Sequence, residues 1–155
     1  MALSSDSMQA LNKIRSTAMR ILALREHSEL ELLQKLRAKG FLEEDIQSIL
    51  KQLTQEDLLS NTRFIDNYIY SRSRKGYGPL RIREELRERG IAEEIIEHHL
   101  NIADNAWFIN VRNVWQKRFK NQIPDDFKTR AQQMRFLQYR GFTQKQINSI
   151  FQSDI

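Results

Sequence analysis

The sequence predicts an all-α protein in which three tandem three-helix repeats form an elongated, curved helical array. The chain of 155 residues contains only five glycines and two prolines, which favours helices over sandwiches or barrels. Its hydrophobic residues recur at helical spacing. The same pattern returns three times with a period close to fifty residues, and such self-similarity is typical of tandem helical units.

Three glycines align the repeats, because each ends a helical pattern and they stand 50 and 51 residues apart, at Gly40, Gly90 and Gly141. Apolar residues match in register around them. The matched sets are Leu36, Leu86 and Leu137; Phe41, Ile91 and Phe142; Ile46, Ile96 and Ile147; Leu50, Leu100 and Phe151; Ile14, Phe64 and Trp115; and Ala18, Tyr68 and Phe119. We expect these side chains to form the core rather than a cofactor site.

The first repeat is predicted over residues 8–53, after a disordered tail over residues 1–7. Its helices are expected at 8–25, 29–39 and 43–53. Ser28 and Glu31 have the spacing of a capping box, in which two side chains satisfy free backbone groups at a helix start. Gly40 can take the left-handed conformation that closes the second helix.

The second repeat is predicted over residues 54–103, with helices at 62–73, 79–89 and 93–102. Ser60 or Asn61 can cap its first helix. Pro79 suits the first position of the next helix, where its missing N–H is not needed.

The third repeat is predicted over residues 104–155, with helices at 105–119, 125–140 and 144–152. Thr143 and Gln146 form a second capping box. A three-helix unit of about 50 residues is marginal alone, so stacking against neighbours should supply much of the burial.

Composition argues against several classes of protein. The chain has no cysteine, so we expect no disulfide, no thiolate nucleophile and a cytoplasmic location. No stretch approaches the roughly 20 apolar residues that span a bilayer. His98 and His99 are adjacent and point about 100° apart on a helix, which does not suit a shared metal ion. We therefore expect no enzyme, metal, cofactor or small-molecule substrate.

The second repeat carries more positive charge than the first. In register, Leu22, Leu24, Glu31 and Leu33 are replaced by Arg72, Arg74, Arg81 and Arg83. With a net charge of +5, this excess favours an anionic partner. We predict that the partner contacts Arg72, Arg74, Lys75, Tyr77, Arg81, Arg83 and Arg87. Gly76 and Gly78 flank Tyr77 and allow close approach of a partner.

A second basic surface is predicted in the third repeat, at Lys117, Arg118, Lys128, Arg130 and Arg135, with Arg112, Lys120 and Arg140 nearby. If the repeats bring these cations near the central cluster, a larger positive surface results.

Residues 71–86, which read SRSRKGYGPLRIREEL, resemble the central signature of the RecX family, the bacterial regulators of the RecA recombinase. The similarity continues at 20–32, 62–65 and 135–142, whereas 57–62 departs from the family pattern. The resemblance implies a nine-helix protein of three repeats that binds the RecA filament in its helical groove or at its growing end. It also implies inhibition of filament extension, ATP hydrolysis, strand exchange and the coprotease activity of the SOS response.

Two other hypotheses remain open. A nucleic-acid-binding module would act through phosphate contacts and would bind bare single-stranded DNA tightly, with a steep salt dependence. An adaptor for another helical partner would use the basic residues only for solubility. Direct DNA contact inside a complex with RecA is compatible with the first of these.

Overall fold

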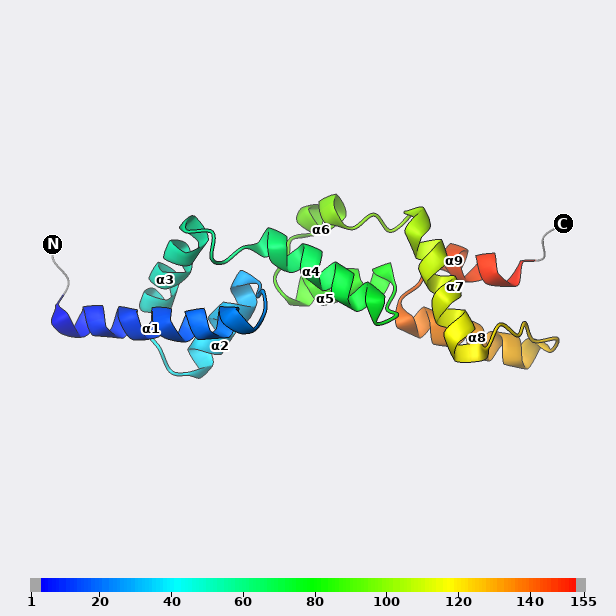
Figure 1. Cartoon of the computed structure of the whole chain (residues 1–155), viewed down its shortest axis with the longest axis horizontal. Coiled ribbons are helices and arrows are strands. Elements are labelled where there is room, and N and C mark those ends of the chain that lie inside the picture. Colours follow the sequence, from blue (N-terminus) through cyan, green and yellow to red (C-terminus); the bar gives the residue numbers. More distant parts are fainter. Residues whose placement is uncertain (1–3, 153–155) are drawn as a thin grey trace. The chain divides into compact units, whose positions relative to one another are not determined.

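The computed structural model describes residues 4–152, and this part of the chain forms nine α-helices and no strand (Figure 1). The helices are α1 (Ser5–Leu24), α2 (Glu29–Ala38), α3 (Glu43–Gln55), α4 (Asn61–Arg74), α5 (Pro79–Glu88), α6 (Glu93–His99), α7 (Asn105–Phe119), α8 (Phe127–Arg140) and α9 (Gln144–Phe151). The predicted all-α class and its tandem three-helix repeats are confirmed.

The chain divides into two compact units. Unit 1 comprises Met1–Asn67 and Arg89–Ile91, and unit 2 comprises Tyr68–Glu88 and Ala92–Ile155. The division falls inside α4, so one continuous helix contributes residues to both units.

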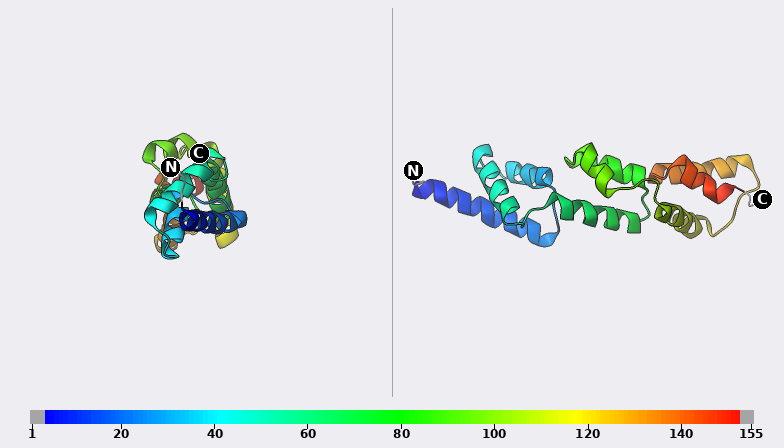
Figure 2. Two further views of the ribbon diagram at one scale, coloured as in Figure 1. Left: turned by 90° about the vertical axis from the view of Figure 1, so that its left-hand side faces the viewer. Right: turned by 90° about the horizontal axis from the view of Figure 1, so that it is seen from above.

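In unit 1, α1, α2 and α3 pack against one another (Figures 1 and 2). Their buried side chains form one core, made of Ile14, Ala18, Leu32, Leu36, Ile46, Ile49, Leu50, Leu53 and Leu59. Burial of this many aliphatic side chains is the main source of stability for such a unit.

In unit 2, α7, α8 and α9 pack against one another, and α5 contacts α6. Trp115 lies at the centre of this part, with its Nε1 donating a 2.8 Å hydrogen bond to Gln133 Oε1 and its ring edge-to-face with Phe151. The buried indole N–H is therefore satisfied inside the core, as buried polar groups require.

Most matched apolar positions of the repeats are buried as predicted, and Leu36, Leu86 and Leu137 are fully inaccessible to solvent. The exceptions among the six sets are Phe41, Tyr68 and Phe119, which are half-buried. Hydrophobic periodicity thus identified the core, because equivalent helix positions are buried in each repeat.

Helix ends follow the predicted signals at most sites. Both capping boxes form, at Ser28 with Glu31 and at Thr143 with Gln146. Ser60 Oγ accepts a 3.2 Å hydrogen bond from the Arg63 N–H at the start of α4. Local side-chain chemistry therefore sets these ends.

Two helix ends differ from prediction by three residues, and the other ends differ by two or fewer. Helix α1 begins at Ser5, because Ser4 Oγ accepts a hydrogen bond from the Ser7 N–H. The predicted disordered tail over 1–7 was therefore too long, and residues 1–3 lie outside the described residues. Helix α6 ends at His99 rather than at residue 102, because Leu100 is extended and Asn101 closes a turn with its side chain.

The glycines that close α5 and α8 also lie against the preceding repeat. A Cβ at Gly90 would stand 2.8 Å from Leu30 Cβ, and one at Gly141 would stand 2.4 Å from Arg81 Cβ. Gly40 closes α2 in the first of the described repeats, and a Cβ there would meet nothing within 4 Å among the described residues. All three have positive φ, so the predicted left-handed closure is confirmed.

Between residues 4 and 152, no helix has the length and apolar character that crossing a membrane requires.

Candidate anion-binding surface

Tyr77 lies in the turn between α4 and α5, and its ring is surrounded by arginines of its own chain. The guanidinium carbons of Arg72, Arg81 and Arg140 lie 3.9, 4.6 and 4.9 Å from the ring centroid. The face of an aromatic ring attracts cations, so these contacts hold the turn against α4, α5 and α8. Tyr77, predicted as a partner contact, is half-buried and already engaged.

Glu85 neutralises two of the predicted contact arginines. Arg72 donates to both carboxylate oxygens at 2.9 and 2.8 Å, and Arg81 Nε lies 3.5 Å from Oε2. Burial would raise the pKa of Glu85, but the hydrogen bonds and charge of Arg72 outweigh it and lower the pKa below its ordinary value. Arg72 and Arg81 therefore serve the internal structure of unit 2.

Arg87 is also paired. It donates to Glu84 and Glu93, and these hydrogen bonds raise its pKa above the ordinary value. Arg83 is half-buried; its charge helps to lower the pKa of Glu93, after the larger effect of Arg87. The buried Nε of Arg83 has no hydrogen-bond partner within residues 4–152.

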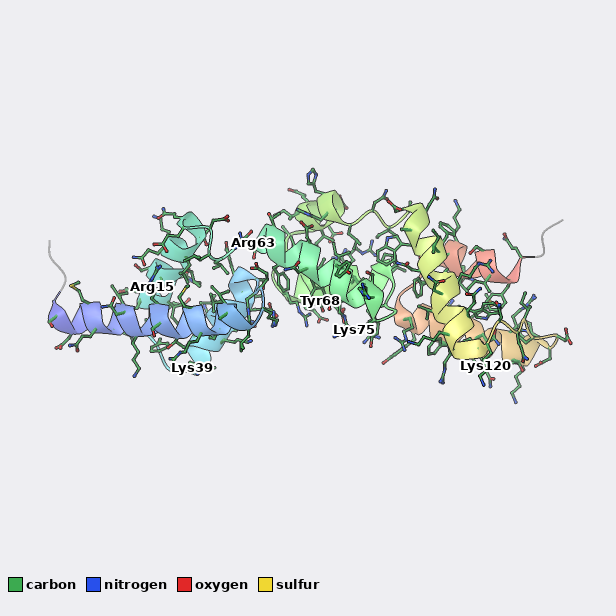
Figure 3. The ribbon with its side chains drawn as sticks, viewed as in Figure 1. Arg15, Lys39, Arg63, Tyr68, Lys75 and Lys120 are labelled. Carbon is green, nitrogen blue, oxygen red and sulfur yellow. The ribbon has the colours of Figure 1, made fainter. Side chains whose placement is uncertain are left out.

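Arg74 and Lys75 differ from these arginines. Both side chains are exposed at the C-terminal end of α4, where Figure 3 labels Lys75. Arg74 Nη1 donates a 2.7 Å hydrogen bond to the Tyr70 hydroxyl, and its guanidinium lies over that ring. In the described part of the chain, neither Arg74 nor Lys75 forms an ion pair with a carboxylate. They remain available to a partner.

The predicted second basic surface is divided in the structure. Lys117 and Arg118, on α7, line a cavity together with Arg74 and Lys75. Lys128, Arg130 and Arg135 lie on α8 and do not line it; Arg130 stacks over Phe151.

This cavity is open to solvent on one side, has a volume of about 500 Å³ and is bordered by the end of α4, by α7 and by α8. We call it the cationic cavity; its charged lining residues are Arg74, Lys75, Lys117, Arg118 and Arg140. The sequence prediction did not include Asn110, Asn113 and Phe136, which also line it, because only the packing of α4 against α7 and α8 brings them to one place.

Gly78 has an internal role rather than the partner contact that we predicted for it. A Cβ at Gly78 would lie 2.5 Å from the Gly141 carbonyl carbon. Its N–H donates a 2.8 Å hydrogen bond to Arg140 O, and the Leu80 N–H donates to Gly141 O at 2.9 Å. The glycine allows close approach, but the segment that approaches belongs to the same chain.

Among the residues that the structure describes, no group of three or more potential metal ligands of the His, Cys, Asp or Glu type is brought together.

Comparison with protein families gives three matches along the chain. Residues 15–53 match the first three-helix domain of RecX, residues 60–100 match the second, and residues 110–151 match the third. Together these matches cover most of the chain.

Comparison with individual proteins agrees. A regulatory protein RecX of Pseudomonas putida is 47% identical over 137 residues, which are 88% of each chain. One of Pseudomonas fluorescens is 42% identical over 143 residues, which are 92% of each chain. The crystal structure of RecX from Lactobacillus salivarius has the same fold, with a TM-score of 0.77, 20% identity and coverage of 93% of this chain and 96% of that chain.

Proposed function

The chain belongs to the RecX family of regulatory proteins, and we propose that it binds the RecA recombinase filament and inhibits the filament's extension, ATP hydrolysis, strand exchange and coprotease activity. The protein acts without chemistry of its own. It therefore serves as a regulator of DNA repair and of the SOS response.

The distribution of paired and unpaired cations carries the proposal. Arg72, Arg81 and Arg87 are engaged by carboxylates, whereas Arg74 and Lys75 project from the end of α4 with no carboxylate partner among residues 4–152. Exposed cations of this kind attract an acidic surface and speed its docking. We place the electrostatic contact at Arg74 and Lys75, and keep Arg83 in the contact set.

In this proposal the protein inhibits RecA by steric exclusion. A helical body that lies across neighbouring subunits of a filament blocks the addition of further subunits, and it also blocks the closing motion on which ATP hydrolysis depends. Tyr77, Arg72 and Arg81 support this contact from inside by fixing the turn that follows Lys75.

The test is ATP turnover by RecA on single-stranded DNA, titrated with the protein. The double variant Arg74→Gln with Lys75→Gln should inhibit less strongly than the wild type. A matched control, Lys13→Gln with Arg20→Gln, removes the same charge from the exposed face of α1 and should inhibit normally. Equal inhibition by both variants would exclude Arg74 and Lys75 as the contact.

A second candidate function is a nucleic-acid-binding module, which the net charge of +5 favours. This function requires tight binding to bare single-stranded DNA, with a salt slope of roughly 0.7 per neutralised phosphate. The proposed function instead requires strong binding only when RecA is present. Measuring the affinity for DNA with and without RecA separates the two.

A further inference from the structure

We propose that the cationic cavity is a binding site for the polyphosphate chain of a small ligand, with nucleoside triphosphates as the ligand class. This inference goes beyond the proposed function and does not depend on it. It rests on the charge, the preorganisation and the size of the cavity.

The charge of the cavity is unbalanced. Its lining contains five cationic side chains and no aspartate or glutamate. Within residues 4–152, no ion pair joins any of the five to a carboxylate. Cations gathered in one concave site repel one another and concentrate counter-ions, so a bound anion with several charges relieves the repulsion.

The rest of unit 2 shows that this imbalance is local. Arg72 on α4 and Arg81 and Arg87 on α5 each lie within 4 Å of a carboxylate oxygen. The fold therefore supplies acidic partners to arginines a few residues away and supplies none at the cavity. Solubility alone does not require that five cations share one concavity.

Two of the guanidinium groups are held in place before any ligand arrives. Arg140 lies 5.2 Å from the Phe136 centroid and 4.9 Å from the Tyr77 centroid, and its Nη1 donates a 3.2 Å hydrogen bond to Lys75 O. Arg118 lies 5.3 Å from the Phe136 centroid. Cations fixed in this way lose little freedom on binding, which favours recognition of phosphate.

Lys75 and Lys117 supply mobile charge around these fixed groups. Both ammonium groups are on exposed side chains, one after α4 and the other on α7. A lysine behaves as a point charge with three donors and can follow a flexible chain of phosphates.

The size and the remaining walls suit a nucleotide. A volume of about 500 Å³ lies in the usual range of small-molecule sites. Val114 gives apolar surface, and the amides of Asn110 and Asn113 give donors and acceptors that a base or a sugar can use.

The arrangement favours a small ligand over a nucleic-acid strand. Proteins that bind single strands place cations along a groove and present open aromatic faces on which bases stack. Here the cations come from three helices and converge on one cavity, and Phe136 is already covered by Arg118 and Arg140.

The experiment is calorimetric titration of the full chain at low salt with three probes: sodium tripolyphosphate, ATP and a short oligothymidylate. We expect saturable binding of tripolyphosphate and of ATP. Tighter binding of ATP would show that the cavity walls also hold the base, and equal affinities would show that the phosphates alone are recognised; both results support the proposal.

Matched variants locate the site. Lys75→Gln with Lys117→Gln should weaken ATP and tripolyphosphate about tenfold or more, because two charge-assisted contacts are lost. Lys13→Gln with Lys51→Gln makes the same chemical change on exposed lysines of unit 1 and should bind as the wild type does. Circular dichroism checks the fold of both. In the wild type, NMR should show shifts of the Asn110 and Asn113 side-chain amides on addition of ATP.

Three results would overturn the proposal. The first is a wild type that binds neither tripolyphosphate nor ATP at low salt. The second is equal binding of both ligands by the two double variants, with the asparagine amides unshifted. The third is binding of the oligothymidylate alone, without competition from tripolyphosphate, which would mean that the cations contact a nucleic-acid backbone. No recombinase is present in these assays, so none of these results bears on inhibition of RecA.

Discussion

His27 is a buried ionisable residue in unit 1, with 1% of its surface exposed. Its Nε2 lies 2.7 Å from Lys35 Nζ, and its Nδ1 lies 3.0 Å from Arg25 O. Because an ammonium can only donate, Nε2 accepts, and the ring proton sits on Nδ1 and is donated to the carbonyl. Burial lowers the pKa of His27 below its ordinary 6.5, and the charges of Arg25 and Lys35 add to this effect.

This environment predicts a loss of stability in mild acid. The unfolded chain takes up a proton near pH 6.5, whereas native His27 resists protonation until its lower pKa. The contribution of His27 to the free energy of unfolding should therefore be largest above about pH 6.5. It should decrease as the pH drops below that value. Urea unfolding at about pH 7.5 and about pH 5.5 measures the difference. His27→Gln should be less stable but should lose most of the pH dependence; an unchanged dependence would contradict this role.

Glu85 is the carboxylate that Arg72 and Arg81 share. The Glu85 side chain is 16% exposed, and the Arg72 side chain is 20% exposed. Glu85→Gln keeps the shape but leaves both guanidinium groups without their countercharge. We expect it to lower the free energy of unfolding by about 1–3 kcal/mol, because the Arg72 charge stays partly buried.

A matched variant tests the role of burial at Glu85. Glu93→Gln removes one of the two carboxylate partners of Arg87. The Glu93 side chain is 42% exposed, against 16% for Glu85, and solvent screens its pair with Arg87, so the loss should be smaller. Chemical unfolding of both variants gives the comparison. Equal losses would mean that burial at Glu85 adds nothing.

At the scale of elements, the three closing glycines form a natural series. All have positive φ, where any other residue is strained. Gly40 meets nothing within 4 Å in the described chain, Gly90 meets the Leu30 side chain, and Gly141 meets the backbone of Arg81. A side chain can shift more easily than backbone, so the space available decreases along the series.

Substitution by alanine should follow that order. Gly40→Ala should lower the free energy of unfolding by about 1 kcal/mol, from the left-handed conformation alone. Gly90→Ala and Gly141→Ala should lose about 1–3 kcal/mol more from overpacking, with Gly141→Ala the most affected. Thermal and urea unfolding of the three variants measure the differences, and equal losses would show that the contact with the preceding repeat is unimportant.

At the scale of the whole molecule, the unpaired cations predict that the proposed inhibition of RecA depends on salt. The Debye length falls from about 10 Å at 0.1 M salt to about 3 Å at 1 M, so an exposed contact weakens as salt rises. Wild-type inhibition of ATP turnover should decline over this range, and the Arg74→Gln, Lys75→Gln variant should change less. RecA without inhibitor is the control at each salt concentration. The same decline in both proteins would mean that other groups make the contact.

Much of the fold could be predicted from the sequence, because the repeat shows which residues serve the architecture. The burial of Leu36, Leu86 and Leu137, the capping boxes and the glycine closures all follow from local spacing. The early end of α6 could not be predicted, since it depends on a turn in which Trp107 Nε1 donates to Asn101 O, and a helical pattern continues through that segment.

The candidate surface was less predictable, because partners on other helices decide which cations are free. Arg72 and Glu85 are 13 residues apart, and only the packing of α4 with α5 makes them a pair. Arg74 looked the same as Arg72 in the sequence and turned out to be exposed. The cationic cavity needs α4, α7 and α8 together, so no single segment indicates it.

The joint between Gly78 and Gly141 consists of main-chain atoms, through the hydrogen bonds from Gly78 N to Arg140 O and from Leu80 N to Gly141 O. Every residue type has a backbone carbonyl, and every type except proline has a backbone N–H. Side-chain substitutions elsewhere on α7 and α8 therefore leave these two hydrogen bonds intact. A chimaera that takes its third repeat from a distant relative should therefore still assemble, provided that the two glycines are kept. The side chains that line the cationic cavity can therefore change during evolution while the backbone contact between Gly78 and Gly141 is kept.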